Sequence, residues 1–187
     1  MKSFLYIVIL FAVFAPDVDA QTVKRDIVGC HIGYGWMDYS PNQGLVGAPG
    51  YYGKDYYRIG FDYEKPLSTC FSVVTGIYYT YNNVVMESNL PPTVDGIFVH
   101  YTKNETVHFI TVPVAIKLNF LNYLNIGVGL NFNNIFIIGP RVSAGVHYEF
   151  PSGFILKVDA DVQLSGFFTR TILYQTGYSA GVAWRLN

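Results

Sequence analysis

Histidine is the side chain best suited to move protons near neutral pH, and this chain has four, at His31, His100, His108 and His147. The rest of a catalytic or metal-binding pattern does not accompany them. The sequence has no H-E-x-x-H, no G-x-S-x-G and no cluster of Cys and His at metal-ligand spacing. It therefore predicts no catalytic residue, no cofactor and no metal ligand.

One grouping of polar residues resembles the rim of the membrane barrels that modify lipid A, which carry His, Ser and acidic side chains. Its members here are His100, His108, Ser88 and Glu105. Their spacing does not by itself argue for a site, so a lipid A-modifying enzyme is an alternative and the main expectation is a protein that is not an enzyme.

A second grouping, Asp159-x-Asp161, resembles a fragment of a calcium-binding loop. It lacks the glycine and the terminal glutamate of such a loop, and it lies in the middle of a predicted strand. We therefore interpret both carboxylates as members of structural ion pairs.

These residues lie in segments where apolar side chains alternate with small or polar ones, which is the pattern of a β-strand. Between Phe154 and Leu164 the even positions are all apolar, whereas the odd positions include Lys157, Asp159 and Asp161. The predicted strands, in chain order, are Asp26–Trp36, Asp55–Glu64, Thr69–Tyr81, Val107–Phe120, Tyr123–Phe132, Ile138–Phe150, Phe154–Leu164 and Tyr174–Leu186. Pro113 and Pro140 weaken two of these strands locally, because proline donates no ladder hydrogen bond.

The connections between the strands alternate in length. Three are tight turns, namely Glu64–Ser68, Leu121–Asn122 and Pro151–Gly153. Four are longer loops, namely Met37–Lys54, Asn82–Thr106, Asn133–Ile137 and Ser165–Leu173. Short turns at one end and longer loops at the other are typical of an up-and-down outer-membrane barrel.

Composition indicates which face of the strands points outward. Charged residues are 13% of the 187 residues, against roughly 25% in ordinary soluble domains, and the net charge of −1 favours no nucleic acid. A soluble, lipocalin-like periplasmic barrel that binds a lipid would need a charged outer face. Here one face carries almost no charge, and the other is rich in Gly, Ser and Asn. We therefore expect the apolar face to contact lipid, with polar residues filling a narrow lumen.

The polar face carries balanced charge. Its cations are Arg58, Lys117, Arg141, Lys157 and Arg185, and its anions are Asp62, Glu64, Glu149, Asp159 and Asp161. Because an eight-stranded lumen is just wide enough for side chains, we expect a plug of paired charges with His31 and His147 among them. An ion-selective pore is the alternative.

Aromatic residues gather at both ends of the predicted strands. At the turn end are Tyr63, Phe71, Phe120, Tyr123, Tyr148, Phe150, Phe154 and Trp184, and at the loop end are Tyr34, Trp36, Tyr57, Tyr79, Tyr81, Phe132 and Tyr174. Two such bands are typical of residues at the two lipid–water interfaces.

The first residues read as an export signal. Lys2 is followed by an apolar stretch from Phe4 to Ala15 and a small-residue cleavage site ending at Ala20. We expect a signal peptide at residues 1–20 and a mature barrel domain at 21–187. Export would permit a disulfide, but Cys30 and Cys70 fall on opposite faces of strands that are not neighbours, so we expect two free thiols.

The loop from Asn82 to Thr106 keeps β-character on both sides of Pro91-Pro92, at Val84-Val85-Met86 and at Ile97 to Tyr101. The third and fourth strands could therefore continue past the membrane as a protruding hairpin that recruits a protein partner by strand addition. The alternative is a solvated loop held by the two prolines.

Several strands resemble a known family. His108 to Phe120, Tyr123 to Leu130, Gly145 to Phe150 and Gly177 to Leu186 are similar to the strands of PorT-like outer-membrane β-barrel proteins, although Phe109 replaces the usual Tyr. This resemblance implies an eight-stranded outer-membrane barrel, and some members of the family are linked to protein secretion.

The sequence thus predicts an all-β, eight-stranded antiparallel up-and-down transmembrane barrel. We expect a monomer surrounded by outer-membrane lipid and lipopolysaccharide, with a structural role or a surface-interaction role through its external loops. An accessory role in secretion or surface assembly is the first alternative.

Overall fold

The computed structural model describes residues 25–40, 50–87, 93–94, 97–98, 102–120, 123–135, 137–166 and 172–186. The predicted signal peptide at 1–20 lies outside these residues. The described elements are the strands β1 (Ile27–Ser40), β2 (Gly50–Pro66), β3 (Phe71–Glu87), β4 (Thr93–Val94), β5 (Ile97–Phe98), β6 (Thr102–Phe120), β7 (Leu124–Asn133), β8 (Ile137–Glu149), β9 (Phe154–Ser165) and β10 (Ile172–Arg185).

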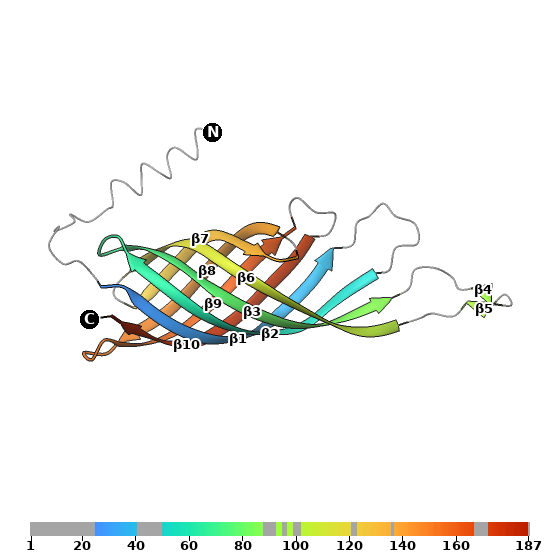
Figure 1. The fold of residues 1–187 in the computed structure, drawn as a ribbon, viewed down its shortest axis with the longest axis horizontal. Helices are drawn as coiled ribbons and strands as arrows, with labels where there is room; N and C mark the ends of the chain where they lie inside the picture. The colour runs from blue at the N-terminus through green and yellow to red at the C-terminus, as the bar shows by residue number, and fades with distance from the viewer. Residues whose placement is uncertain are drawn as a thin grey trace, which may run out of the picture.

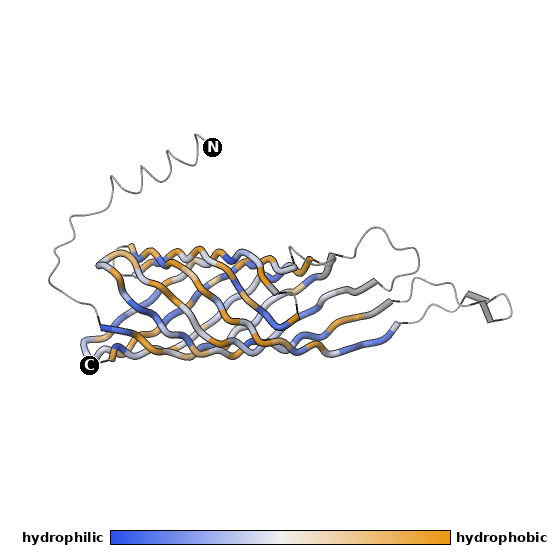
Figure 2. Tube along the Cα trace, turned by 45° about the horizontal axis from the view of Figure 1, so that its top comes forward, coloured by the Kyte–Doolittle hydropathy of each residue, from blue (hydrophilic) through white to orange (hydrophobic). Residues whose placement is uncertain are grey.

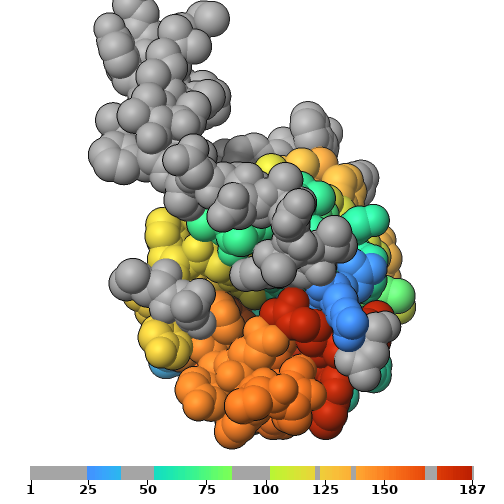
Figure 3. Space-filling view, turned by 90° about the vertical axis from the view of Figure 1, so that its left-hand side faces the viewer, coloured from blue at the N-terminus to red at the C-terminus, as the bar shows by residue number. Residues whose placement is uncertain are grey.

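Eight of these strands form one closed antiparallel barrel in the order β1-β10-β9-β8-β7-β6-β3-β2 (Figure 1). Every neighbour in the barrel is also a neighbour among the long strands in sequence, except where β1 meets β10. That last pair runs from Ile27 opposite Arg185 to Ser40 opposite Ile172. At the turn end, the start of β1 and the end of β10 lie side by side (Figure 3). The predicted up-and-down eight-stranded fold is confirmed.

Hydrophobic and hydrophilic residues alternate along the barrel strands (Figure 2). The exposed fractions of the side chains place the polar set inside the barrel and the apolar set outside. On β10, for example, Gln175 and Ser179 are buried in the lumen, whereas Tyr178 points outward and is 71% exposed. The opposite arrangement would be needed to hold a lipid in the lumen, so the alternative of a soluble lipid-binding barrel is wrong. No helix in the described part of the chain is long and apolar enough to span a membrane.

The strands at the turn end match the prediction closely, with one correction at the start of β3. Thr69 and Cys70 belong to the turn, and β3 begins at Phe71. The side-chain oxygen of Ser68 accepts hydrogen bonds from the backbone N–H groups of Cys70 (3.3 Å) and Phe71 (3.0 Å), which holds the turn together. A serine that bonds to the backbone ahead of it favours a turn over a strand.

The strands at the loop end are longer than predicted, and all four predicted loops are wrong in part, two of them by no more than two residues at each end. Met37 to Ser40 continue β1, and Gly50 to Lys54 begin β2. Asn82 to Glu87 belong to β3 and pair with Thr102 to Val107 of β6, so the predicted continuation of the third and fourth strands into this loop is confirmed, and the recruitment of a partner stays a prediction. These segments lack a strict apolar–polar alternation in sequence because their outward side chains lie beyond the apolar wall, whereas Met37, Asn82 and Val84 still face the buried interior.

We call the three paired segments Gly50–Gly53, Asn82–Glu87 and Thr102–Val107 the three-stranded extension. It continues past the barrel along the barrel's long axis, with the short β4–β5 pair farther out (Figure 1). A register shift in β2 between Gly53 and Tyr56 marks its base. The side-chain amide of Asn82 fills this bulge by donating to the carbonyl oxygens of Lys54 (3.3 Å) and Asp55 (3.1 Å).

Both prolines lie where a ladder is interrupted, as predicted. The pairing of β3 with β6 skips from Thr75 opposite Val114 to Tyr78 opposite Thr111, which omits Pro113. Pro140 pairs with Leu130 of β7 but comes just before the first residue of β8 that pairs with β9. Each strand therefore tolerates its proline by giving up ladder contacts on one side.

Candidate functional site

The middle of the lumen is closed by a buried ion pair. Arg58 of β2 donates from both terminal nitrogens to the carboxylate of Asp161 on β9, with 3.1 Å between Nη1 and Oδ2. Each residue is only 3% exposed. Arg141 of β8 lies alongside, with its Nε 3.8 Å from Oδ2 of the same carboxylate. Burying these charges costs several kcal/mol per ion, so the network persists only because each charge faces an opposite one.

Tyr78 connects this pair to a second group of charges nearer the turn end. Its hydroxyl accepts from Nη1 of Arg141 (3.1 Å) and donates to Asp62 (2.7 Å). Asp62 also accepts from Lys157 and pairs with Nδ1 of His31 at 2.9 Å. One continuous network therefore runs from Lys157 to Arg58 across five strands.

Two further ion pairs line the turn end. Glu64 accepts from Lys117 (2.7 Å) and from the hydroxyl of Ser72 (2.6 Å). Arg185 forks onto Glu149 through two bonds of 2.6 Å each. All ten charges predicted for the inner face point inward, and nine of them are in these pairs. Asp159 is the only one of the ten for which the described part of the chain supplies no ion pair.

A cavity of about 710 Å³ occupies the lumen at the turn end, below Tyr78 and Arg141. Asn119, Asn125 and His147 line it, and each has a buried side-chain atom without a protein partner. Asp159, which also lines the cavity, lies against Gly145, where an added Cβ would overlap its carboxylate. Such a polar, roomy space suits ordered water.

The loop end of the lumen is filled by apolar side chains, of which Tyr56 lies at an inward position of the predicted strand Asp55–Glu64. Met37, Tyr56, Val84, Phe109 and Leu173 form one buried cluster, with Val107 packed against it. Met37, Val84 and Leu173 lie in predicted loops, yet each continues the inward alternation of its strand: Met37 is two residues from Gly35, Leu173 two from Gln175, and Val84 four from Thr80. The apolar cluster fills the lumen at the loop end, and the ion pairs fill its middle. Together these side chains close the lumen, as the hypothesis of a plug of paired charges predicted.

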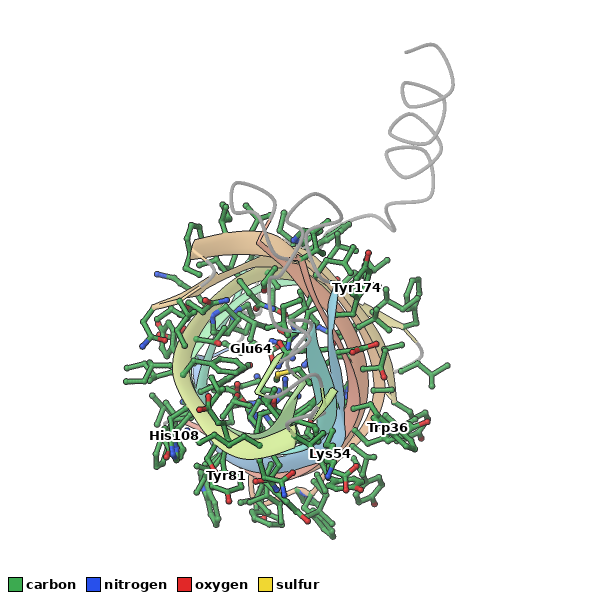
Figure 4. All side chains as sticks on the ribbon, turned by 90° about the vertical axis from the view of Figure 1, so that its right-hand side faces the viewer. Trp36, Lys54, Glu64, Tyr81, His108 and Tyr174 are labelled. Carbon is green, nitrogen blue, oxygen red and sulfur yellow. The ribbon has the colours of Figure 1, made fainter. Side chains whose placement is uncertain are left out.

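The proposed rim grouping is not assembled among the residues that can be placed. His108 points away from the barrel, where its Nδ1 lies 2.6 Å from the hydroxyl of Tyr79 (Figure 4). Glu105 lies on the opposite face of β6 and pairs with Lys103 at 2.7 Å. Ser88 and His100 lie outside the described residues. His31 and His147 are lumen residues, as predicted, and the described part of the chain holds no cluster of three or more His, Cys, Asp or Glu in a metal-binding arrangement.

The two cysteines are free, as predicted. Cys30 is on the outer face of β1, opposite Phe61 and Val182, while Cys70 lies in the turn before β3 and lines the cavity. β1 and β3 are separated by β2 in the barrel, so the two sulfur atoms cannot meet without rearrangement.

The aromatic residues of both predicted bands lie on the outside of the barrel. At the turn end, Tyr148, Phe150, Phe154 and Trp184 form a continuous chain of ring contacts with centroids 4.8–5.7 Å apart. At the loop end, the rings of Tyr34, Tyr57, Tyr81 and His108 contact each other across four neighbouring strands. Figure 4 shows Trp36, Tyr81 and His108 outside the ring of strands and Glu64 inside it.

A closed eight-stranded meander with an apolar wall, aromatic bands and a polar interior has the fold of the small outer-membrane β-barrels. No protein-family model matches the chain, and no curated protein matches it in sequence. The PorT-like resemblance is therefore supported only at the level of the outer-membrane barrel class.

Solved structures similar to this chain include Ail, the attachment invasion locus protein of Yersinia pestis, in complex with the heparin analogue sucrose octasulfate. That match has a TM-score of 0.50 and 14% identity, and it covers 86% of this chain and 99% of the other. Ail without the ligand matches with a TM-score of 0.47 and 11% identity over the same shares. At this identity the likeness is one of fold alone.

Proposed function

We propose that this chain is an integral outer-membrane barrel, not an enzyme, that displays the three-stranded extension as a binding surface for a partner outside the cell. The observation that carries the proposal is the continued pairing of β3 with β6, from Asn82 opposite Val107 to Glu87 opposite Thr102, beyond the last residue that β7 contributes. This continued pairing holds the segments outside the barrel in a fixed shape, as a binding surface requires and a simple connection between two strands does not.

Membrane insertion is supported by the outer wall. Ile32, Phe61, Ile77, Val128 and Val162 are all more than half exposed, and water would make that arrangement costly. The predicted signal peptide at residues 1–20 supports export, and the aromatic bands would contact outer-membrane lipid and lipopolysaccharide. Carbonate extraction and fractionation of cells that express the chain would test this location, and recovery in the soluble periplasm would contradict it.

The filled lumen argues for a surface role over a pore. We expect the purified chain in planar bilayers to give no large conductance steps. The ion pair of Arg58 with Asp161 and the apolar cluster that includes Met37 and Phe109 close the lumen at two levels. Regular open-channel steps would support the pore alternative.

Binding by the extension can be tested by shortening it. Asn82 and Val107 are directly opposite each other, so a two-residue Asn-Gly turn that joins them removes the outer hairpin and leaves the barrel strands in register. Cross-linking on intact cells should recover a partner with the full chain and lose it with the shortened chain. A matched control replaces residues 134–136, between β7 and β8, with an Asn-Gly turn and should keep the partner.

An accessory role in secretion, which the PorT-like resemblance implies, would use the same surface, and a secretion assay with the shortened chain would separate it from simple adhesion. A polyanion such as the one bound to Ail is less suited to this extension, since Lys103 is already paired with Glu105. The lipid A-modifying alternative is disfavoured by the opposite orientations of His108 and Glu105, and mass spectrometry of lipid A with and without the protein would decide it.

A further inference from the structure

Among the described residues, one edge of β6 has no neighbouring strand where β6 passes beyond the barrel. β3 pairs with the other edge as far as Thr102, whereas the pairing with β7 stops at Thr111 opposite Asn133. Asn134 completes this side: its backbone N–H donates to the Ile110 carbonyl (3.3 Å) and its side-chain oxygen accepts from the Ile110 N–H (3.0 Å). Beyond Ile110, the described part of the chain places no strand beside this edge. Such an edge presents backbone donors and acceptors to an incoming strand.

The residues along this edge have a self-complementary order of charge. The sequence from Thr102 to Thr106 is Thr-Lys-Asn-Glu-Thr, and reading it backwards exchanges only the lysine and the glutamate. Lys103 and Glu105 point to the same face of β6, and their side chains are 51% and 37% exposed. The two side chains pair with each other at 2.7 Å, and a second strand alongside would let each charge exchange this partner for the opposite charge across the strand pair.

We propose that the partner of this edge is the same edge of a second copy of the chain, paired antiparallel about Asn104. This inference rests on the proposed role of the extension as an external binding surface, and it names the partner. In this register each Lys103 lies opposite the Glu105 of the other copy, and Thr102 lies opposite Thr106. Opposite charges directly across two strands stabilise the pairing.

Neighbouring registers are disfavoured by the same residues. Because side chains alternate between faces, two copies related by a two-fold axis can slide only in steps of two residues. One such step places Lys103 opposite Lys103, and a step the other way places Glu105 opposite Glu105. Like charges directly opposite each other destabilise a sheet. Charged residues on an edge strand usually prevent pairing with another strand. Here they disfavour the neighbouring registers and permit the one that is centred on Asn104.

The geometry also fixes where the second copy lies. The extension runs along the barrel's long axis (Figure 1), so two antiparallel β6 strands place their barrels at opposite ends of the joined sheet. The two barrels would then be in membranes that face each other. The pairing would join two copies in two different membranes, so each membrane would still hold the barrel as a monomer.

Charge exchange tests the register. For the full chain in detergent, sedimentation equilibrium should show association that Lys103→Glu or Glu105→Lys each weakens by at least about tenfold. The double variant K103E/E105K should restore it, and an equimolar mixture of the two single variants should form mixed dimers. Lys65→Glu, at the exposed turn end of β2, is the matched control and should have no effect. Vesicles that carry the chain should cluster with the same dependence on the variants.

A cysteine scan provides a second test that does not depend on charge. With Cys30 and Cys70 replaced by serine, Asn104→Cys should form a disulfide-linked dimer on mild oxidation, because the two Asn104 positions face each other. Thr106→Cys alone should not, whereas a mixture of Thr102→Cys and Thr106→Cys should. Absence of the Asn104 dimer, or failure of the double charge variant to associate, would overturn the pairing. A different result would contradict the proposed function of the extension: the shortened chain would then retain every cross-linked partner.

Discussion

Arg58 and Asp161 are 103 residues apart in the chain, yet they form a two-point ion pair across the lumen. β2 and β9 are not neighbours in the barrel, so the pair spans the interior and does not merely reinforce the wall. Arg141 shares the same carboxylate, so Asp161 contacts two buried guanidinium groups.

Removal of Asp161 should therefore be costly. We expect Asp161→Ala to lower the free energy of unfolding by about 3–5 kcal/mol, because it leaves Arg58 buried without a compensating charge. Urea unfolding in phospholipid vesicles would measure the change. Asp159→Ala, two residues away on the same face of the same strand, is the control and should cost under about 1 kcal/mol. If the two variants lowered the free energy of unfolding equally, Asp161 would not be the carboxylate on which the buried ion pairs depend.

Replacement of both partners should be much milder than removal of one. We expect Arg58→Met combined with Asp161→Leu to unfold within about 1–2 kcal/mol of the parent, since apolar side chains of similar volume avoid the cost of desolvating two ions. Arg141 retains its bond to Tyr78 in this variant. A double variant as unstable as Asp161→Ala alone would indicate that Arg141 depends on the same carboxylate.

The outward wall should reject charge near its middle. Val128 of β7 points outward and is more than half exposed. We expect Val128→Lys to destabilise the chain by about 2–4 kcal/mol in bilayers, because the ammonium would face hydrocarbon. Thr106→Lys, on the extension, should leave the free energy of unfolding within about 0.5 kcal/mol. No difference between the two would argue that the wall does not contact lipid.

The two thiols should differ in reactivity while the chain is folded in a membrane. Cys70 lies in the turn and lines the open cavity, so a membrane-impermeant maleimide applied from the turn side should label it readily. Cys30, on the outer wall, should remain unlabelled until the chain is unfolded. Denaturation without reductant should then release two reactive thiols for each chain, and recovery of none would indicate a disulfide.

Much of this architecture follows from period-2 patterning alone. In the barrel, Lys157, Asp159 and Asp161 must share one face and Leu156, Val158 and Ala160 the other, because successive side chains leave opposite sides of a strand. The apolar set must be outward because it includes almost no charge, so the strand count, the inner charges and the two aromatic bands could all be predicted from the residues in order.

Pattern gives less information at the loop end. Met37, Val84 and Leu173 looked like loop residues, because beyond the apolar wall nothing requires alternation and a strand there is held by its neighbours' backbone bonds. The length of β3 and β6 is decided by their mutual pairing and by the bulge that Asn82 fills in β2. Those contacts join segments that are distant in sequence, and local preference does not encode them.

The sequence by itself determined which residues face lipid, which face the interior, and how many strands close the barrel. All three follow from the alternation of apolar and polar residues along each segment, which relates a residue to its neighbours two positions away. The tertiary structure alone decided the partners: that Arg58 meets Asp161, that Tyr78 joins two groups of charges, and that β6 continues past the end of β7. The physical reason is that inward side chains from non-adjacent strands meet only after the barrel closes, when shear and tilt set their relative heights.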